Sequence, residues 1–187
     1  HWPGIRARKA TVRAQLNRAK NKGVVVTQWT PEKATHHPEL ERCVREWLGT
    51  RGLPPLHFLV EPETLAFLDD RHVYVAERNG EVVGFLLMSP VPVRNGWLVE
   101  QIIRGNNAPN GTNELLLDAA MQHLAVERAS FVTLGLSPLS SRSGIPQTEQ
   151  SAYIRLLLHW VRAHGRRFYN FDGLDAFKAK FLPDRWE

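Results

Sequence analysis

The sequence lacks the hallmarks of several protein classes. It contains one cysteine, Cys43, which excludes an internal disulfide framework and favours a reducing compartment. It has no low-complexity tract and no internal repeat, so a solenoid is excluded. Its apolar runs are shorter than the roughly 20 residues that cross a bilayer, and it shows no cleavable signal pattern. We expect a soluble domain with one core, and the start at His1 suggests a fragment of a longer protein.

Acidic residues are absent from residues 1–31, although the chain as a whole contains 19 of them. Seven of the 24 basic residues lie in this segment: Arg6, Arg8, Lys9, Arg13, Arg18, Lys20 and Lys22. The net charge of +5 therefore comes from this segment alone. We predict a basic helical arm over residues 1–23, followed by one domain over residues 24–187. Such an arm attracts the phosphates of RNA or of an anionic lipid surface, and a merely solvated helix face is the alternative.

Periodicity predicts a mixed α/β order. Val12, Leu16 and Ala19 recur at helical spacing, and Asn79-Gly80 between two apolar runs is a hairpin signal. The predicted helices cover residues 9–22, 38–47, 112–124, 153–164 and a terminal segment after Gly173. The predicted strands cover residues 24–27, 73–76, 82–88, 97–103, 131–136 and 168–171. This order indicates a mixed, mostly antiparallel sheet flanked by helices, of the acetyltransferase-like kind, with the helix at 112–124 covered on more than one side.

The segment from Arg104 to Thr112 joins a strand to a helix through a loop that contains glycine, which is the general form of a phosphate-binding turn. In acetyltransferases that use coenzyme A, this loop needs small residues and free backbone amides. Asn107 and Pro109 occupy those positions here, and Pro109 has no amide to donate. We therefore predict no coenzyme. The alternative is that Asn110-Gly111-Thr112 only turns the chain and caps the helix.

Charged side chains follow a regular spacing on both sides of this loop. Glu114, Asp118 and Gln122 lie four residues apart on an apolar helix, which predicts either a solvated stripe or a pocket for an amine. On the preceding strand, two-residue alternation places Glu100 and Arg104 on one face, where they could also pair with each other.

Near the C-terminus, Lys178 and Lys180 point to different faces of the predicted helix, so we expect at least one of them to be solvated. Anion binding and stabilisation of the helix dipole are both consistent with these lysines. Among the histidines, His123 and His159 lie on predicted helices without partners at metal-ligand spacing. We predict no metal site, and we find no Ser-His-Asp order.

Several short motifs, in this order and spacing, resemble one known family. They are Gly52-Leu53-Pro54-Pro55-Leu56, Asp70-Arg71, Gly84-Phe85, Ser89-Pro90, Arg104, Ala108-Pro109, Gly111-Thr112-Asn113-Glu114, Gly135-Leu136-Ser137-Pro138-Leu139-Ser140 and Tyr169-Asn170-Phe171 to Phe177-Lys178. Together they are similar to the C-terminal domain of the phosphatidylglycerol lysyltransferases, the multiple peptide resistance factor family.

The resemblance implies an acetyltransferase-like fold that uses aminoacyl-tRNA and no coenzyme A. The acceptor would be the hydroxyl of phosphatidylglycerol, at the cytoplasmic side of the membrane, and the modified lipid would give resistance to cationic antimicrobial peptides. The family's catalytic part resembles two such domains in tandem behind membrane segments, and this chain resembles the second. Which amino acid and which acceptor are used remains open.

By residue type and position, the resemblance suggests a set of site residues. Arg104, Lys178 and Asp172 are the expected catalytic residues, with Arg104 and Lys178 as donors to a phosphate or oxyanion. The expected substrate-binding residues are Glu100, Gly111, Thr112, Glu114, Asp118, Tyr169 and Asn170. Asp172, Glu114 and Asp118 are the candidates for the base or the amino-acid pocket. An N-acetyltransferase dependent on acyl-coenzyme A and a non-catalytic module that docks RNA or lipid are the alternatives.

Overall fold

The computed structural model describes residues 2–50, 62–135 and 171–186. Contacts between residues divide the chain into two units, residues 1–135 and residues 136–187, and each is described by itself. The first unit holds every described strand, and the second contains one described helix, α7 (Phe171–Ala179). No helix among these residues is long and apolar enough to span a membrane.

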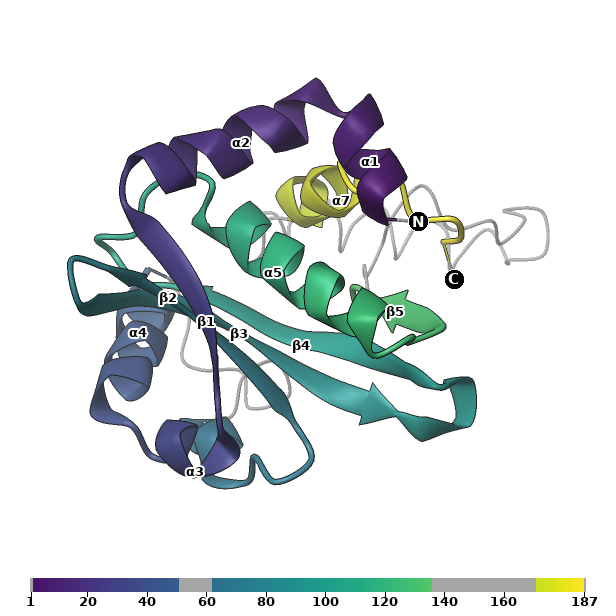
Figure 1. The fold of residues 1–187 in the computed structure, drawn as a ribbon. Helices are drawn as coiled ribbons and strands as arrows, with labels where there is room; N and C mark the ends of the chain where they lie inside the picture. The colour runs from purple at the N-terminus through teal and green to yellow at the C-terminus, as the bar shows by residue number, and fades with distance from the viewer. Residues whose placement is uncertain (1, 51–61, 136–170, 187) are drawn as a thin grey trace, which may run out of the picture. The chain divides into compact units, whose positions relative to one another are not determined.

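The first unit is built on a five-stranded sheet whose spatial order follows the sequence (Figure 1). The strands are β1 (Val24–Trp29), β2 (His72–Arg78), β3 (Glu81–Val91), β4 (Gly96–Arg104) and β5 (Phe131–Thr133). The strands β1 to β4 pair antiparallel, whereas β4 and β5 pair parallel. A parallel pair needs a crossover, and α5 (Thr112–Val126) supplies it. The predicted fold class, a mixed and mostly antiparallel sheet flanked by helices, is confirmed.

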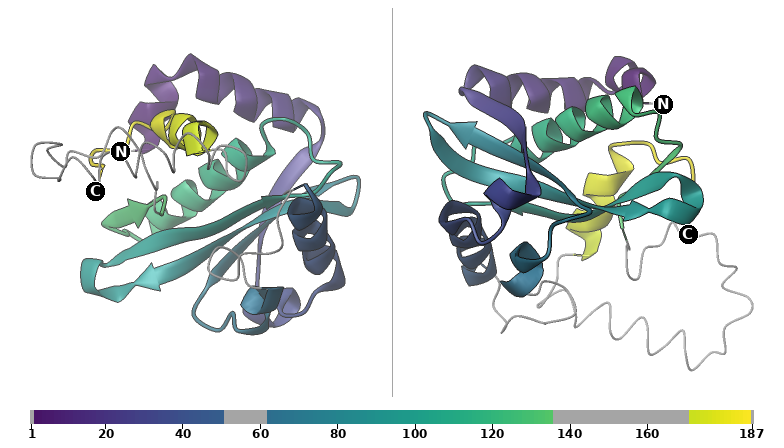
Figure 2. Two further views of the ribbon diagram at one scale, coloured as in Figure 1. Left: turned by 180° about the vertical axis from the view of Figure 1, so that it is seen from behind. Right: turned by 60° about the horizontal axis from the view of Figure 1, so that its bottom comes forward.

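Helices cover both faces of the sheet (Figures 1 and 2). One face carries α5, and α2 (Ala10–Asn21) packs onto α5 in turn, so α5 is covered on more than one side as predicted. The other face carries α3 (Pro31–Ala34), α4 (Pro38–Gly49) and the short helix η1 (Pro62–Ala66). Their apolar side chains form a core with the inward residues of β2, β3 and β4.

The hairpin prediction is confirmed, because β2 and β3 are joined at Asn79 and Gly80, both in the left-handed region with φ of 53° and 82°. Periodicity predicted one helix over residues 9–22 of the basic arm, and the structure has a further helix before it, α1 (Trp2–Arg8). Pro3 is tolerated in the first turn of this helix, because the amide that proline lacks would have no partner there.

The C-terminal helix begins three residues earlier than predicted, because Phe171, Asp172 and Gly173 all belong to α7. Phe171 was expected to end a strand over residues 168–171, but it is the first residue of α7. The rest of that strand and the predicted helix over residues 153–164 lie outside the described residues. In the first unit, a second short 3-10 helix, η2 (Pro92–Arg94), connects β3 to β4.

Candidate functional site

The loop that follows β4 lies against α4. The amide of Gly105 donates to the carbonyl of Val83 at 2.9 Å, which extends the pairing of β4 with β3 by one residue. A Cβ at Gly105 would lie 2.8 Å from Glu46 Oε2 and 3.3 Å from Cys43 Sγ, so a larger residue cannot fit without movement. Glycine at this position therefore allows the loop to approach α4 closely.

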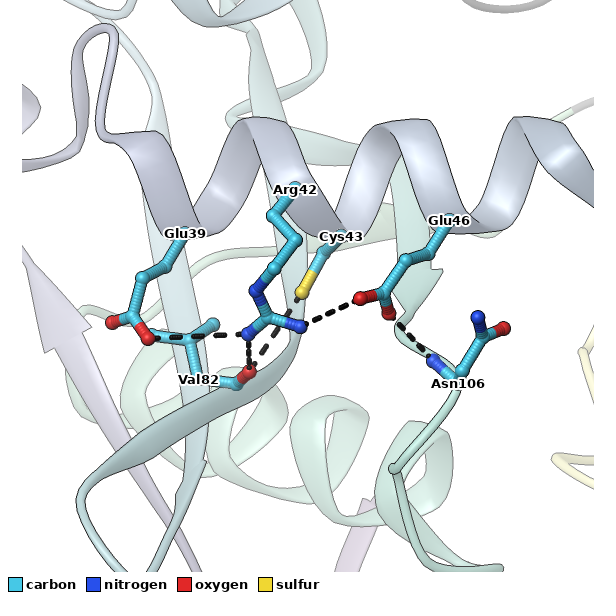
Figure 3. A network of polar contacts seen from close by, with 6 residues as sticks. All are labelled: Glu39, Arg42, Cys43, Glu46, Val82 and Asn106. Carbon is cyan, nitrogen blue, oxygen red and sulfur yellow. Dashed lines mark hydrogen bonds and ion pairs between the residues drawn. The ribbon is translucent and has the colours of Figure 1, made fainter.

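A polar network connects α4 to this loop and to β3 (Figure 3). Arg42 donates from Nη1 to Glu46 Oε1 at 2.8 Å and from Nη2 to the Val82 carbonyl at 2.7 Å. The other oxygen of Glu46 accepts the backbone amide of Asn106 at 2.8 Å. These donors, the Asn106 amide first and Arg42 second, lower the pKa of Glu46 below its usual 4.5. Glu39 lies 3.9 Å from Arg42 and completes the network.

The network bears on the prediction of a phosphate-binding turn. A phosphate bound at this loop would need the amides that follow β4. The amide of Asn106 already donates to a carboxylate of the protein itself, and Pro109 has no amide. The loop therefore uses its Asn106 amide for a hydrogen bond within the protein, to Glu46. This agrees with the sequence of the loop, which lacks the coenzyme A signature.

The start of α5 is fixed by Gly111 and Thr112. Gly111 has a φ of 95°, and a Cβ there would clash with the carbonyl oxygen of Gln15 on α2. The Thr112 hydroxyl is fully buried and donates to the Pro109 carbonyl at 2.7 Å. In this structure, both predicted substrate-binding residues therefore shape the turn and the packing of α2.

Two of the three side chains in the polar stripe of α5 are buried, so the interpretation of Glu114 and Asp118 as solvated is wrong, whereas Gln122 is exposed. Both are buried, and Asp118 is only 1% exposed. The Asp118 carboxylate accepts Trp2 Nε1 at 2.7 Å and Gln122 Nε2 at 2.8 Å, and Arg6 Nε lies 3.5 Å away. The sequence could not reveal this burial because residues of α1, more than 100 positions away, contact the stripe.

Glu100 and Arg104 do not share a face, contrary to the expectation from strict alternation. Leu87 pairs with Gln101 and Met88 pairs with Val99, so Glu100 is the extra residue of a β-bulge. The bulge turns Glu100 towards the η1 face, where it accepts a hydrogen bond from Ser89 and lies 3.5 Å from Arg71 Nη1. Arg71 in turn lines a surface pocket of about 520 Å³ between β1 and residues 69–72.

Arg104 ends β4 and is exposed. Its Nη1 donates to the side-chain oxygen of Asn110 at 3.4 Å, within the loop that leads to α5. Ile103 belongs to the core on the α4 face, so alternation directs its neighbour Arg104 towards the α5 face. The predicted pair of Glu100 with Arg104 is therefore not formed.

The second unit contains the remaining predicted residues. Lys178 on α7 is 7% exposed, and desolvation lowers the pKa of its amine to about 8, with Asp175 opposing the shift. Lys180 is partly buried, with its Nζ 5.5 Å from the centre of the Phe177 ring. Asp172 lies in the first turn of α7, whereas Tyr169 and Asn170 lie outside the described residues.

Sequence reasoning missed two clusters. Arg42 and Glu46 have the i,i+4 spacing of a helical ion pair, which was the available signal for the network of Figure 3. His123 was predicted to have no partners at metal-ligand spacing, but His72 and Glu127 lie beside it, and the ligand atoms of the three residues are within 4.8 Å of one another. His72 lies on a strand 51 positions earlier, and spacing in sequence cannot predict that proximity.

Comparison with known proteins agrees with the resemblance. The family model described as "Phosphatidylglycerol lysyltransferase, C-terminal" matches residues 7–187. The phosphatidylglycerol lysyltransferase of Bacillus subtilis (strain 168) is 24% identical over 152 residues, which are 78% of this chain and 17% of that protein. The chain thus spans about a sixth of that relative's length.

Two solved structures share the fold. A C-terminal DUF2156 domain from Agrobacterium fabrum, assigned to a lysylphosphatidylglycerol synthetase, matches with a TM-score of 0.65 and 27% identity, over 94% of this chain and 51% of that one. L-PGS from Bacillus licheniformis matches with a TM-score of 0.64 and 22% identity, over 93% of this chain and 52% of that one. Since the family model covers nearly the whole sequence, the chain belongs to the family of phosphatidylglycerol lysyltransferase C-terminal domains.

Proposed function

We propose that the protein serves the transfer of an aminoacyl group, lysyl first among the candidates, from aminoacyl-tRNA to a hydroxyl of phosphatidylglycerol. The observation that carries this proposal is the family match over residues 7–187. The internally bonded loop after β4 supports a donor other than coenzyme A, because its Asn106 amide is used by Glu46. The exposed basic side chains of α1 and α2 support a donor rich in phosphate.

The proposed reaction exchanges one ester for another. The lipid hydroxyl oxygen attacks the carbonyl carbon of the aminoacyl ester, and its proton passes to a base. The tetrahedral oxyanion then collapses, the bond to the ribose oxygen breaks, and that oxygen takes up a proton. The products are an aminoacylated lipid and uncharged tRNA. An ester is consumed and an ester is formed, so the reaction needs no redox group and no further source of energy.

The proposed catalytic residues are Lys178, Arg104 and Asp172. In its ammonium form Lys178 would donate to the oxyanion, and a buried donor stabilises such a charge more strongly than a solvated one. Arg104, exposed at the end of β4, would bind a phosphate of the tRNA or lipid. Asp172 would act as the base. These roles rest on residue type and on the family resemblance.

For the amino-acid pocket we propose Glu114, which lies buried in the first turn of α5. The Asp118 carboxylate is used by Trp2, Gln122 and Arg6, so we propose that Asp118 supports the pocket by fixing α1 on α5. The other residues retained as substrate-binding proposals are Glu100, Gly111, Thr112, Tyr169 and Asn170.

The basic arm over residues 1–23 would contact the phosphates of tRNA or of the cytoplasmic membrane surface. Val12, Leu16 and Ala19 are buried, whereas Arg13, Arg18, Lys20 and Lys22 are exposed, so α2 has one packed face and one basic face. Addition of lysine would change the lipid headgroup from net negative to net positive. This change would weaken the attraction of cationic peptides to the membrane and thereby give resistance to them.

The test is an assay with radiolabelled lysyl-tRNA and alanyl-tRNA and vesicles that contain phosphatidylglycerol. We expect label to enter the lipid from one of the two tRNAs, and Asp172→Ala and Lys178→Ala to reduce this transfer by at least tenfold. A matched control is Lys33→Ala, which removes a lysine that stacks on Trp29 at 3.7 Å outside the proposed site. Unchanged transfer in both site variants would exclude the proposed residues.

A docking module is the second candidate, because the chain spans only 17% of its Bacillus subtilis relative. A docking module would bind tRNA in a salt-sensitive way and lose this binding when residues 1–22 are deleted. It would transfer no label to the lipid. Binding of acetyl-coenzyme A, measured by calorimetry, would instead support the hypothesis of an N-acetyltransferase. We expect no such binding.

A further inference from the structure

Three metal-ligating side chains meet in the first unit, and none of them is among the residues proposed for the transferase site. His72 begins β2, while His123 and Glu127 lie one turn apart at the C-terminal end of α5. Glu127 Oε1 lies 3.5 Å from His123 Nε2 and 3.9 Å from His72 Nε2. The three ligand atoms lie within 4.8 Å of one another.

The two imidazole rings are already oriented for a shared ligand. The buried hydroxyl of Tyr74 lies 2.8 Å from His123 Nδ1 and 3.5 Å from His72 Nδ1. Since Tyr74 contacts the Nδ1 atoms, both Nε2 atoms are directed towards Glu127. Trp97 stacks on His72 with ring centres 3.8 Å apart, which restricts rotation of that ring. A hydrogen bond at the second ring nitrogen is the usual support of a histidine that binds metal.

We propose that His72, His123 and Glu127 form a binding site for a divalent transition-metal ion, with Zn²⁺ as the ion that fits best. Two imidazole nitrogens and one carboxylate oxygen are a common zinc ligand set, with water in the fourth position. At zinc bond lengths, tetrahedral ligand atoms lie about 3.3 Å apart. The distances from Glu127 Oε1 to His123 Nε2 and to His72 Nε2 exceed this value by less than about 1 Å. Small side-chain rotations can close these gaps.

The surroundings of the cluster favour binding from solution. Glu127 is 37% exposed, so a hydrated ion can reach the carboxylate. Thr112, at the other end of α5, lies eleven residues before His123, or roughly 16 Å along the helix axis. The ion would therefore connect the start of β2 with the end of α5 and strengthen the first unit. This role is structural, and the proposal goes beyond the aminoacyl transfer.

The test uses the chain without a histidine tag, treated with chelator and then titrated with Zn²⁺ in a calorimeter. We expect the Zn²⁺ dissociation constant to rise at least tenfold in His123→Ala and in Glu127→Gln. The matched control is His36→Ala, because His36 and Glu41 form an exposed pair at 3.7 Å that offers only two ligands. This control should bind Zn²⁺ as the unchanged protein does.

Three further measurements separate a built site from adventitious binding. Zn²⁺ should raise the melting temperature of the unchanged protein and of His36→Ala, but not of Glu127→Gln, since an ion that binds only the folded state stabilises it. Tyr74→Phe should keep one bound ion with about tenfold weaker affinity. Co²⁺ should show the visible absorption of a four- or five-coordinate site. Equal Zn²⁺ affinity in Glu127→Gln and the unchanged protein would overturn the proposal, as would the absence of any binding.

Discussion

The carboxylate of Glu46 on α4 accepts the backbone amide of Asn106, 60 residues away, at 2.8 Å (Figure 3). Glu46 also accepts Arg42, so one side chain satisfies an amide of the loop and a guanidinium of its own helix. This bond occupies the first part of the loop in which a phosphate-binding turn was expected. It makes Glu46 a determinant of the loop's conformation.

Removal of the Glu46 carboxylate should lower the free energy of unfolding. We expect a loss of about 1–2 kcal/mol in Glu46→Ala, because the Asn106 amide and Arg42 lose their acceptor. Chemical denaturation at pH 7 measures this loss. Glu41→Ala is the control, and it should cost less than about 0.5 kcal/mol, since its partners Arg45 and His36 are both exposed.

The contribution of Glu46 should also depend on pH. Its folded pKa lies below the usual 4.5, so the folded state favours the ionised form. The stabilisation is fully present above pH 4.5 and should disappear as the pH falls from 4.5 through the lower folded pKa. The difference in stability between the unchanged protein and Glu46→Gln should therefore narrow below pH 4.5. A constant difference down to pH 2 would contradict the assignment.

Gly105→Ala should destabilise the protein by about 1–3 kcal/mol. The added methyl group would lie 2.8 Å from Glu46 Oε2 and 3.3 Å from Cys43 Sγ. Either the Glu46 carboxylate must shift and weaken its bonds to Asn106 and Arg42, or the loop must move. Gly49→Ala is the matched control: nothing lies within 4 Å of a Cβ there, and alanine at the end of α4 should be neutral or slightly stabilising. Equal melting temperatures for the two variants would show that the loop does not depend on this close approach.

Cys43 should react slowly with thiol reagents in the folded protein. It is fully buried, and desolvation raises its pKa from 9.0 to about 11. This shift alone lowers the fraction of thiolate about 100-fold near pH 8. Because the thiolate is the reactive form, the rate of labelling falls with it. Labelling with a chromogenic disulfide should be fast in denaturant and at least 100-fold slower without it. Because Cys43 is the sole cysteine, its labelling reports unfolding directly.

If Lys178 donates to the oxyanion, transfer of the aminoacyl group should decline above pH 8. The pKa of its amine is about 8, so the ammonium form is lost as the pH rises through this value. Lys178→Arg keeps its charge, and we expect a lower rate whose decline above pH 8 is absent. The measurement is initial rate against pH, corrected for spontaneous hydrolysis of the aminoacyl ester. The same decline in Lys178→Arg would assign the titration to another group.

Local patterns predicted the elements of this fold better than its contacts. The spacing of Val12, Leu16 and Ala19 predicted α2, and Asn79-Gly80 predicted the turn between β2 and β3. The bulge at Glu100 was not predictable, because a bulge depends on how β4 pairs with β3. One extra residue was enough to place Glu100 and Arg104 on different faces.

The sequence by itself determined the properties that depend only on residue type. Pro109 lacks an amide, and the single Cys43 excludes an internal disulfide. The absence of acidic residues from residues 1–31 places the net positive charge on one arm. The tertiary structure alone decided which groups meet. It buried Asp118 under Trp2, bonded Glu46 to the Asn106 amide, and brought His72 to His123 and Glu127. Periodicity reports only neighbours along one element, whereas these contacts form between elements that are distant in the chain.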